Sequence, residues 1–149
     1  MFPLPKPMRI ALDAARAAAA EGEVPVGAVV MLGDEVIATA ANAPRRLCDP
    51  TAHAEMLAIR AAARTLGRER LEDCDLWVTL EPCAMCAGAI AHARLRRLYY
   101  GAGDAKGGAV EHGPRFFAQP TCHHRPELYP AIGTEESAAL LRGFFAARR

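Results

Sequence analysis

The chain has 149 residues, of which 52% are hydrophobic and 23% are charged. Length and composition predict one soluble globular domain that spans residues 1–149 and is long enough to bury a core. The formal net charge of +1 excludes a strongly basic nucleic-acid-binding domain, although positive charge carried almost wholly by arginine still allows local phosphate-binding patches.

The cysteines and the N-terminal residues indicate a cellular compartment. Five cysteines, an odd number, argue against a disulfide framework and favour the reducing cytoplasm. The first seven residues contain three prolines and lack an apolar segment, so they are not expected to act as a signal peptide. No apolar run approaches the ~20 residues of a bilayer-spanning helix, and we expect no membrane association.

In chain order, the first elements are predicted to be a helix and a β-hairpin. Apolar residues at helical spacing predict a helix over residues 8–21, and Gly22 is its expected stop. A β-branched, apolar run predicts a buried strand over residues 24–31. After a tight turn, residues 36–41 are expected to form its hairpin partner.

A second helix is predicted after a loop. Thr51 is the expected N-cap of a helix over residues 52–66. This assignment places His53 and Glu55 in the first turn of the helix, where the helix dipole favours the negative charge of Glu55.

The next elements alternate between strand and helix. Residues 75–80 are predicted as a strand that runs into Pro82 and a helix over residues 84–91. Cations at positions 94–97 are expected to close that helix, as its C-terminus prefers, and residues 98–101 are predicted as another strand. Because the two strands flank a helix, we expect them to be parallel.

Residues 101–130 are predicted to be irregular, and a loop region of this length in a compact domain usually carries function. A final helix is predicted over residues 135–149, with a stripe of leucine and phenylalanine side chains. The sum is an α/β fold: a three-layer α/β/α sandwich around a central mixed sheet of about five strands.

A metal site is the main chemical signal in the sequence. Cys83 and Cys86 share one helix face, directly behind a proline. With His53 they make the three-ligand set of a catalytic zinc site, whose fourth position is open to water. Zinc lowers the pKa of such a water from ~15.7 to ~7. We therefore predict His53, Cys83 and Cys86 as ligands of one Zn²⁺, and Glu55 as the catalytic base beside it.

Other uses of the Cys-x-x-Cys pair remain open from the residues alone. A redox pair would leave the His-x-Glu pattern without a purpose. A structural zinc site would need a fourth ligand, and the remaining cysteines, Cys48, Cys74 and Cys122, are scattered singly.

Three further groups have two interpretations each. The Cys-His-His run at residues 122–124 is either a second metal cluster or part of a substrate or dimer loop. The phenylalanine pairs at 116–117 and 144–145 either stack on bases or pack in the core, and we expect at least one member of each pair in the core. The arginines at 94–97 are either a solvated helix end or an RNA-binding patch.

Taken together, these motifs resemble those of the cytidine deaminase-like superfamily, and most of all those of bacterial tRNA-specific adenosine deaminases. A His-x-Glu followed by Pro-Cys-x-x-Cys is the signature of zinc-dependent nucleobase deaminases. That motif marks only the superfamily, and the runs around it narrow the resemblance. The matching stretches are residues 23–29, 49–55, 78–89, 101–109 and 144–145.

The resemblance implies a reaction and its partners. Members of this family convert the wobble adenosine of a tRNA anticodon to inosine, and they act as homodimers. By this likeness we expect a tRNA anticodon stem-loop as substrate, one zinc ion per subunit and a homodimer. The adenosine would be flipped out of the stack and attacked by water, with Glu55 acting as base and then as acid.

The resemblance also implies substrate contacts. Asn42 would hydrogen-bond the target base, and backbone groups of Ala54 and of the turn at Pro82 would line its pocket. Val26 and Leu80 would contribute apolar surface. The residues that would contact or border the RNA outside the base pocket are Asp104, Lys106, Phe145 and Arg148, together with Phe144 and Arg149.

The sequence departs from the family pattern in three places, and two rival functions stay open. The chain has Ala43 where family members often have arginine, a shorter basic tail, and a different loop over residues 110–125. One rival is a deaminase of free bases or nucleosides, such as cytosine or guanine, which would use the same zinc site. The other is a non-catalytic RNA-binding protein with structural zinc, against which Glu55 argues.

Overall fold

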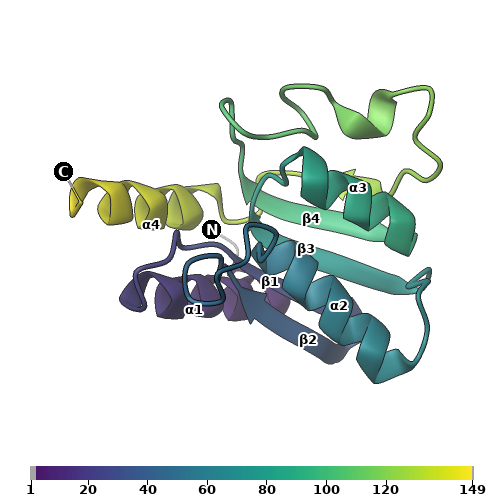
Figure 1. Ribbon diagram of the computed structural model, residues 1–149, viewed down its shortest axis with the longest axis horizontal. Coiled ribbons are helices and arrows are strands. Elements are labelled where there is room, and N and C mark those ends of the chain that lie inside the picture. The colour runs from purple at the N-terminus through teal and green to yellow at the C-terminus, as the bar shows by residue number, and fades with distance from the viewer. Residues whose placement is uncertain (1–2, 149) are drawn as a thin grey trace.

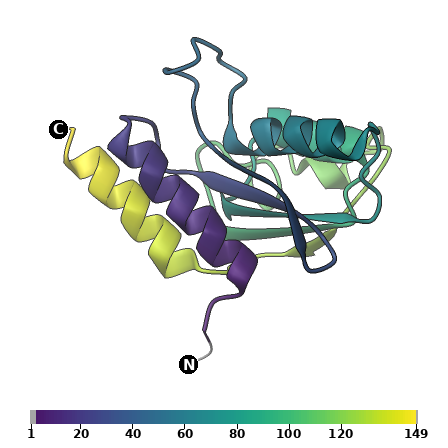
Figure 2. The ribbon, with the colours of Figure 1, turned by 90° about the horizontal axis from the view of Figure 1, so that it is seen from below.

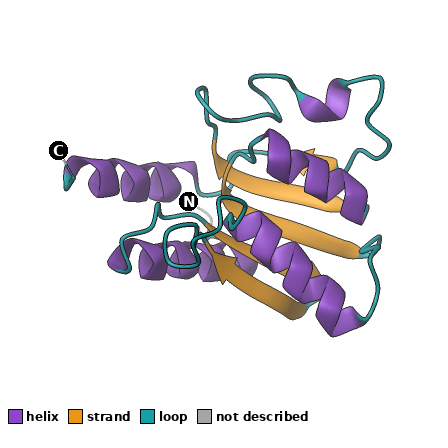
Figure 3. Cartoon of the chain, viewed as in Figure 1, coloured by secondary structure: helices purple, strands orange, loops and turns teal. Residues whose placement is uncertain are grey.

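The computed structural model describes residues 3–148 and contains a five-stranded mixed sheet. The strands are β1 (Gly27–Leu32), β2 (Glu35–Ala41), β3 (Cys74–Leu80), β4 (Arg97–Ala102) and β5 (Glu127–Tyr129). They lie in the order β2-β1-β3-β4-β5 (Figures 1 and 3). β1 is antiparallel to β2 and β3, whereas β3, β4 and β5 are parallel, so the predicted parallel pairing is confirmed.

Helices cover both faces of this sheet. They are α1 (Lys6–Ala20), α2 (Ala54–Leu66), α3 (Ala84–Ala93) and α4 (Thr134–Ala146), with a short 3₁₀ turn, η1, at Phe116–Ala118. α1 and α4 lie side by side on one face, and α2 and α3 cover the opposite face (Figure 2). The three-layer α/β/α sandwich predicted from the sequence is therefore confirmed. No helix within residues 3–148 is both long and apolar enough to cross a membrane.

Burial on both faces explains the continuous apolar sequence of β1. Val29 and Met31 share a cluster with Met8 of α1. Ala28 and Val30, which alternate with them, belong to the core that includes side chains of α2 and α3. Because successive side chains of a strand point to opposite faces, both sets of positions must be apolar here.

The helix α1 approaches the start of β1 very closely at Gly27. An added Cβ at this position would lie 1.9 Å from the carbonyl oxygen of Ala11. Glycine therefore allows direct packing of the helix backbone on the strand. The Gly27 N–H donates to the buried hydroxyl of Thr79 in β3 (3.2 Å), which fixes the edge where β1 begins and β3 ends.

The starts of β1 and α2 differ from the predicted ranges for identifiable reasons. β1 begins at Gly27 and not at residue 24, because Pro25 has no N–H to donate to a neighbouring strand. α2 begins at Ala54 with His53 as its N-cap, so the predicted Thr51 cap is wrong. The Thr51 N–H and hydroxyl instead donate to Asp49 Oδ1, at 2.8 and 2.7 Å.

The predicted closing cations of α3 are also wrong in part. The chain leaves the helix at Arg94, which adopts a left-handed conformation with φ of 60°. Arg96 then forms a bidentate pair with Asp75, at 2.9 and 2.8 Å. Arg97 opens β4 and pairs with Glu127 at 2.9 Å. These two arginines are thus held in ion pairs at the sheet, not at a helix end.

The fifth strand lies within the stretch predicted to be irregular. β5 pairs with β4, with Tyr129 opposite Tyr99. The rings of Trp77, Tyr99 and Tyr129 stack across three strands, with centroids 3.7 and 4.7 Å apart. The final helix is predicted to reach residue 149, but α4 ends at Ala146. Arg149 lies outside the described residues.

Candidate zinc centre and substrate pocket

His53, Cys83 and Cys86 come together at the N-terminal ends of two helices. The Nδ1 atom of His53 lies 3.6 Å from the sulfur of Cys83 and 3.6 Å from that of Cys86. A tetrahedral zinc with Zn–S of about 2.3 Å and Zn–N of about 2.0 Å would separate these atoms by about 3.5 Å. The three residues therefore fit one zinc ion.

The backbone around His53 leaves its imidazole available for this role. As N-cap of α2, His53 makes no side-chain bond to the helix. The first free N–H of the helix, on Ala54, instead donates to the side-chain oxygen of Asn42 at 2.8 Å. Asn42 follows β2, and its own N–H donates to the carbonyl of Val26 at 3.0 Å. Asn42 thus caps the helix from outside and joins three segments at the site.

The two sulfurs lie at the start of α3, where Cys83 is the N-cap. A side-chain hydrogen bond from Cys86 lowers the pKa of the Cys83 thiol to about 4, against the opposing effect of burial. The same hydrogen bond, together with burial, raises the pKa of Cys86. A helix N-terminus and a cation both favour thiolate, so a bound dication would favour ionisation of both sulfurs.

Glu55 lies in the first turn of α2 beside these ligands, and only 4% of its surface is exposed. Burial raises the pKa of Glu55 to about 6. A carboxyl group with a pKa close to neutrality can both accept and return a proton at the working pH. The arrangement of a buried acid beside three metal ligands is therefore chemically suited to proton transfer.

No second cluster of this kind occurs among the described residues: only His53, Cys83 and Cys86 form a group of three or more potential ligands within 4.8 Å of one another. The Cys122 thiol donates to the carbonyl of His124 at 3.1 Å, and His124 Nε2 lies 2.6 Å from the carbonyl oxygen of Leu95. The metal interpretation of residues 122–124 is therefore contradicted.

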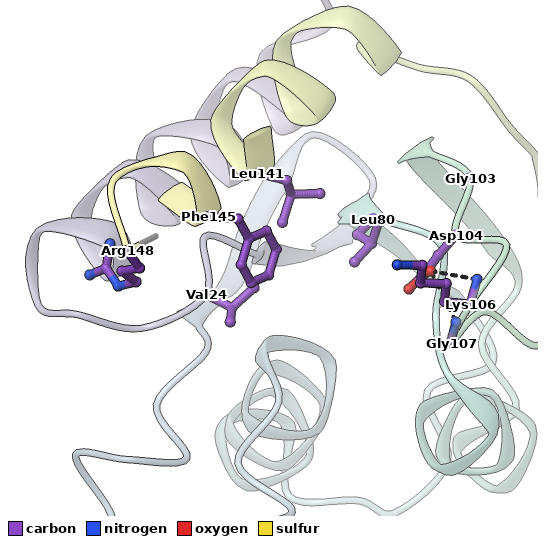
Figure 4. Close-up of a pocket in the computed structure, with 9 residues that line it drawn as sticks. All are labelled: Val24, Leu80, Gly103, Asp104, Lys106, Gly107, Leu141, Phe145 and Arg148. Carbon is purple, nitrogen blue, oxygen red and sulfur yellow. Dashed lines mark hydrogen bonds between the residues drawn. The ribbon is translucent and has the colours of Figure 1, made fainter. Parts of the chain in front are cut away.

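A pocket of about 800 Å³ opens between α4, the end of β3 and the loop after β4 (Figure 4). None of the zinc ligands lines it, although Leu80 on its wall lies three residues before Cys83 in the chain. The lining residues are Val24, Leu80, Gly103, Asp104, Lys106, Gly107, Leu141, Phe145 and Arg148.

Nine of the predicted substrate-contacting residues fall into two groups in the structure; of the other two, Phe144 is buried and Arg149 lies outside the described residues. Leu80, Asp104, Lys106, Phe145 and Arg148 line the pocket. The others lie around the zinc ligands: Val26 and Ala54 are joined through Asn42, and Pro82 adjoins Cys83. Contact of either group with a substrate stays a prediction.

Sequence reasoning missed part of the pocket wall. Gly103 and Gly107 lie in the stretch 101–109 that carries the family resemblance, and Leu141 belongs to the apolar stripe of the last helix. The glycines and the apolar stripe are both visible in the sequence, but only the fold shows that α4 lies against the loop that contains these glycines.

Sequence reasoning placed the backbone of Glu81 near the base pocket but missed its side chain, a buried carboxylate next to the zinc motif. Burial alone would raise the pKa of Glu81, but hydrogen bonds from Asp104, His112 and Val110 outweigh it, and the pKa is lowered. Glu81 is therefore an ionised acceptor inside the protein, with its donors in the loop after β4.

The phenylalanine pairs divide between core and surface, as expected. Phe117 and Phe144 are buried, whereas Phe145 is 47% exposed. The guanidinium of Arg148 lies 3.5 Å from the centroid of the Phe144 ring, a cation–π contact that holds this arginine at the end of α4. Phe145 is thus an exposed aromatic surface on the pocket wall.

Comparison with known proteins assigns this geometry to a family. The family model described as the cytidine and deoxycytidylate deaminase zinc-binding region matches residues 4–102. A tRNA-specific adenosine deaminase of Agrobacterium fabrum is 58% identical over 142 residues, which cover 95% of this chain and 93% of the relative.

Solved structures agree with this assignment. One, from a study of tRNA deaminases that edit adenosine to inosine at the wobble position, superposes with a TM-score of 0.89 and 58% identity, over 91% of this chain and 98% of that one. A guanine deaminase of Bacillus subtilis superposes with a TM-score of 0.65 and 34% identity, over 95% and 91%. This chain therefore belongs to the cytidine and deoxycytidylate deaminase family of zinc-binding enzymes, and within it to the tRNA-specific adenosine deaminases.

Proposed function

We propose that this protein hydrolyses adenosine to inosine, with release of ammonia, at the wobble position of a tRNA anticodon. The observation that carries the proposal is the buried carboxylate of Glu55 beside three convergent metal ligands. A structural zinc site has no use for such a carboxylate, so the arrangement supports catalysis over a scaffold role.

The proposed chemistry uses Glu55 twice. One zinc ion per subunit would be held by His53, Cys83 and Cys86. It would supply a water molecule acidic enough to ionise to hydroxide, the nucleophile, at neutral pH. Glu55 accepts a proton as the water oxygen attacks the purine carbon that bears the amino group. It gives that proton to the adjacent ring nitrogen, then transfers the remaining hydroxyl proton to the amine, which leaves as ammonia.

We propose that the reacting base lies among the residues around the ligands. Asn42 uses its side-chain oxygen on the Ala54 N–H, so its side-chain NH₂ is the group that would donate to a base. Val26 and Leu80 would supply apolar surface on either side, and the backbone at Pro82 would complete the edge next to Cys83.

The pocket beyond the metal centre supports an RNA substrate over a free base. Lys106 and Arg148 supply positive charge at opposite ends of the pocket, and Phe145 lies between them (Figure 4). Asp104 lies beside Lys106. Cations with an exposed aromatic ring are the features that bind single-stranded nucleic acid. A free base would leave these groups without a partner.

The test compares the zinc-loaded wild type with Glu55→Ala on an anticodon stem-loop that carries adenosine at the wobble position. We expect inosine from the wild type, and a rate lower by about 10²–10⁴-fold or more from Glu55→Ala, with zinc content unchanged. A Glu55→Ala variant of full activity would contradict the catalytic role of Glu55. A wild type that releases ammonia from guanine or cytosine but leaves the stem-loop unchanged would contradict the RNA substrate.

We also propose a homodimer, because the family resemblance implies one. Light scattering of the purified protein should give a mass twice the 16.0 kDa of a single chain. A mass of one chain across the accessible concentration range would contradict this assembly.

A further inference from the structure

Glu81 makes an unusual set of contacts that the proposed reaction does not use. Its side chain is fully buried between the end of β3 and the zinc motif. Oε1 accepts the N–H of Asp104 at 2.9 Å and lies 2.6 Å from His112 Nδ1. Oε2 accepts the backbone N–H groups of Val110, Glu111 and His112 at 3.0, 3.0 and 3.1 Å.

All five donors belong to one loop, residues 103–112, which we call the wall loop. The opposite side of the wall loop lines the pocket through Asp104, Lys106 and neighbouring glycines. Asp104 Oδ1 accepts the N–H groups of Lys106 and Gly107, at 3.1 and 3.0 Å, and closes the tip. Glu81 therefore holds both ends of the wall loop, and Asp104 shapes the part between them.

The wall loop also packs directly on the zinc motif. An added Cβ at Gly108 would lie 2.4 Å from the Glu81 carboxyl group, so no side chain fits between them. The N–H of Ala109 donates to the carbonyl of Pro82 at 2.9 Å. The position of the loop relative to Cys83 is thus set by contacts with Glu81 and Pro82, the two residues before that ligand.

We infer that Glu81 is a positioning residue that fixes the wall loop and thereby sets the affinity for the RNA around the reacting adenosine. The identity of the bound substrate rests on the proposed function, whereas the anchoring of the loop does not. Because the wall loop carries Lys106 but no zinc ligand, its release should weaken substrate binding and leave the metal in place.

Glutamine at position 81 isolates this role. In one orientation its NH₂ group meets the two donors of Oε1, and in the other it meets the three donors of Oε2. In either orientation some donors of the wall loop lose their acceptor, although the size of the side chain is kept. Gly108→Ala disturbs the same contact from the other side. Glu127→Gln, at an exposed glutamate of β5, is the matched control.

Two measurements on the zinc-loaded protein test the inference. In Glu81→Gln and Gly108→Ala, hydrogen exchange at the amides of residues 104 and 110–112 should accelerate by about tenfold or more. KM for the anticodon stem-loop should rise by about tenfold while kcat stays within about threefold of wild type. Zinc content should not change, and Glu127→Gln should match wild type throughout.

Several outcomes would overturn the inference. Unchanged exchange at these amides in Glu81→Gln shows that Glu81 does not anchor the loop, and faster exchange with unchanged KM shows that anchoring does not set affinity. Loss of zinc assigns Glu81 to the metal centre instead. Where Glu81→Gln does not fold, His112→Ala removes one side-chain donor only, and it should shift exchange and KM in the same direction by less. Failure of the proposed function is separate, since wild type then leaves the stem-loop unchanged while exchange still reports on the loop.

Discussion

Two loops border the site, and each is held by a glutamate that is only 2% exposed. Residues 42–52 lead from β2 to the zinc ligand His53, and Glu23 accepts the backbone N–H groups of Arg45 and Arg46 at 3.2 and 2.7 Å. In residues 103–112, the wall loop, Glu81 accepts the backbone N–H groups of four residues: Asp104, Val110, Glu111 and His112.

The difference lies in which part of its loop each carboxylate binds: Glu23 accepts two adjacent N–H groups, whereas Glu81 accepts N–H groups from both ends of its loop. The first loop is also held by Asn42 on Ala54, by Asp49 on Thr51, and by backbone bonds within it, so Glu23 is one support among several. The wall loop also donates to Asp104 and to the carbonyl of Pro82, but one carboxylate, Glu81, joins its two ends. Support of the metal ligand is therefore distributed, whereas support of the pocket wall is concentrated, and substitutions should separate the two.

The largest effect is expected from Cys86→Ser, which removes a zinc ligand. The variant should lose zinc and deaminase activity, and its Tm should fall, because metal binding contributes to folding. The amides of the wall loop should keep their exchange protection, since Glu81 is intact. Metal analysis and hydrogen exchange check both points, and a wall loop that loses protection together with the metal would contradict the separation.

An intermediate effect is expected from Asn42→Ala. The buried Ala54 N–H would lose its acceptor, which costs about 1–3 kcal/mol of unfolding free energy. Asn42→Asp is the matched control, because it keeps an oxygen for Ala54 but loses the NH₂ proposed to contact the base. We expect near-normal unfolding and low kcat/KM from Asn42→Asp. Full activity of that variant would refute the base contact.

The smallest effect is expected from Glu23→Gln. Each carboxylate oxygen of Glu23 takes one N–H, so glutamine keeps one bond and loses the other. The free energy of unfolding in urea should fall by about 0.5–1.5 kcal/mol, with zinc content and KM as in wild type. An increase in KM as large as that predicted for Glu81→Gln would remove the contrast between the loops.

The parts of the molecule with local signals could be predicted from sequence. The hairpin and the parallel strand-helix-strand unit follow from periodicity, and both appear in the sheet. The grouping of His53, Cys83 and Cys86 could be predicted because each ligand lies at the start of a helix. The three-residue spacing of Cys83 and Cys86 places both sulfurs on one helix face. Within α2 the prediction missed the cap, because the acceptor for Ala54 comes from Asn42, twelve residues away.

The remaining features depend on contacts between distant segments. β5 has three residues and exposed side chains, so no pattern marks it, and only pairing with β4 defines it. The pocket exists because α4 returns to the edge of the sheet near Leu80. Glu81 stands inside a recognisable motif, yet its donors lie 23 to 31 residues later in a loop without periodicity.

The bonds from the wall loop to Glu81 come mostly from main-chain N–H groups, which every residue except proline possesses. The loop can therefore exchange most of its side chains, Lys106 among them, and keep its shape, provided that Asp104 and Gly108 are kept. Such a loop is a suitable place to alter which nucleotides an engineered descendant accepts, because variation there leaves the metal centre and its geometry undisturbed.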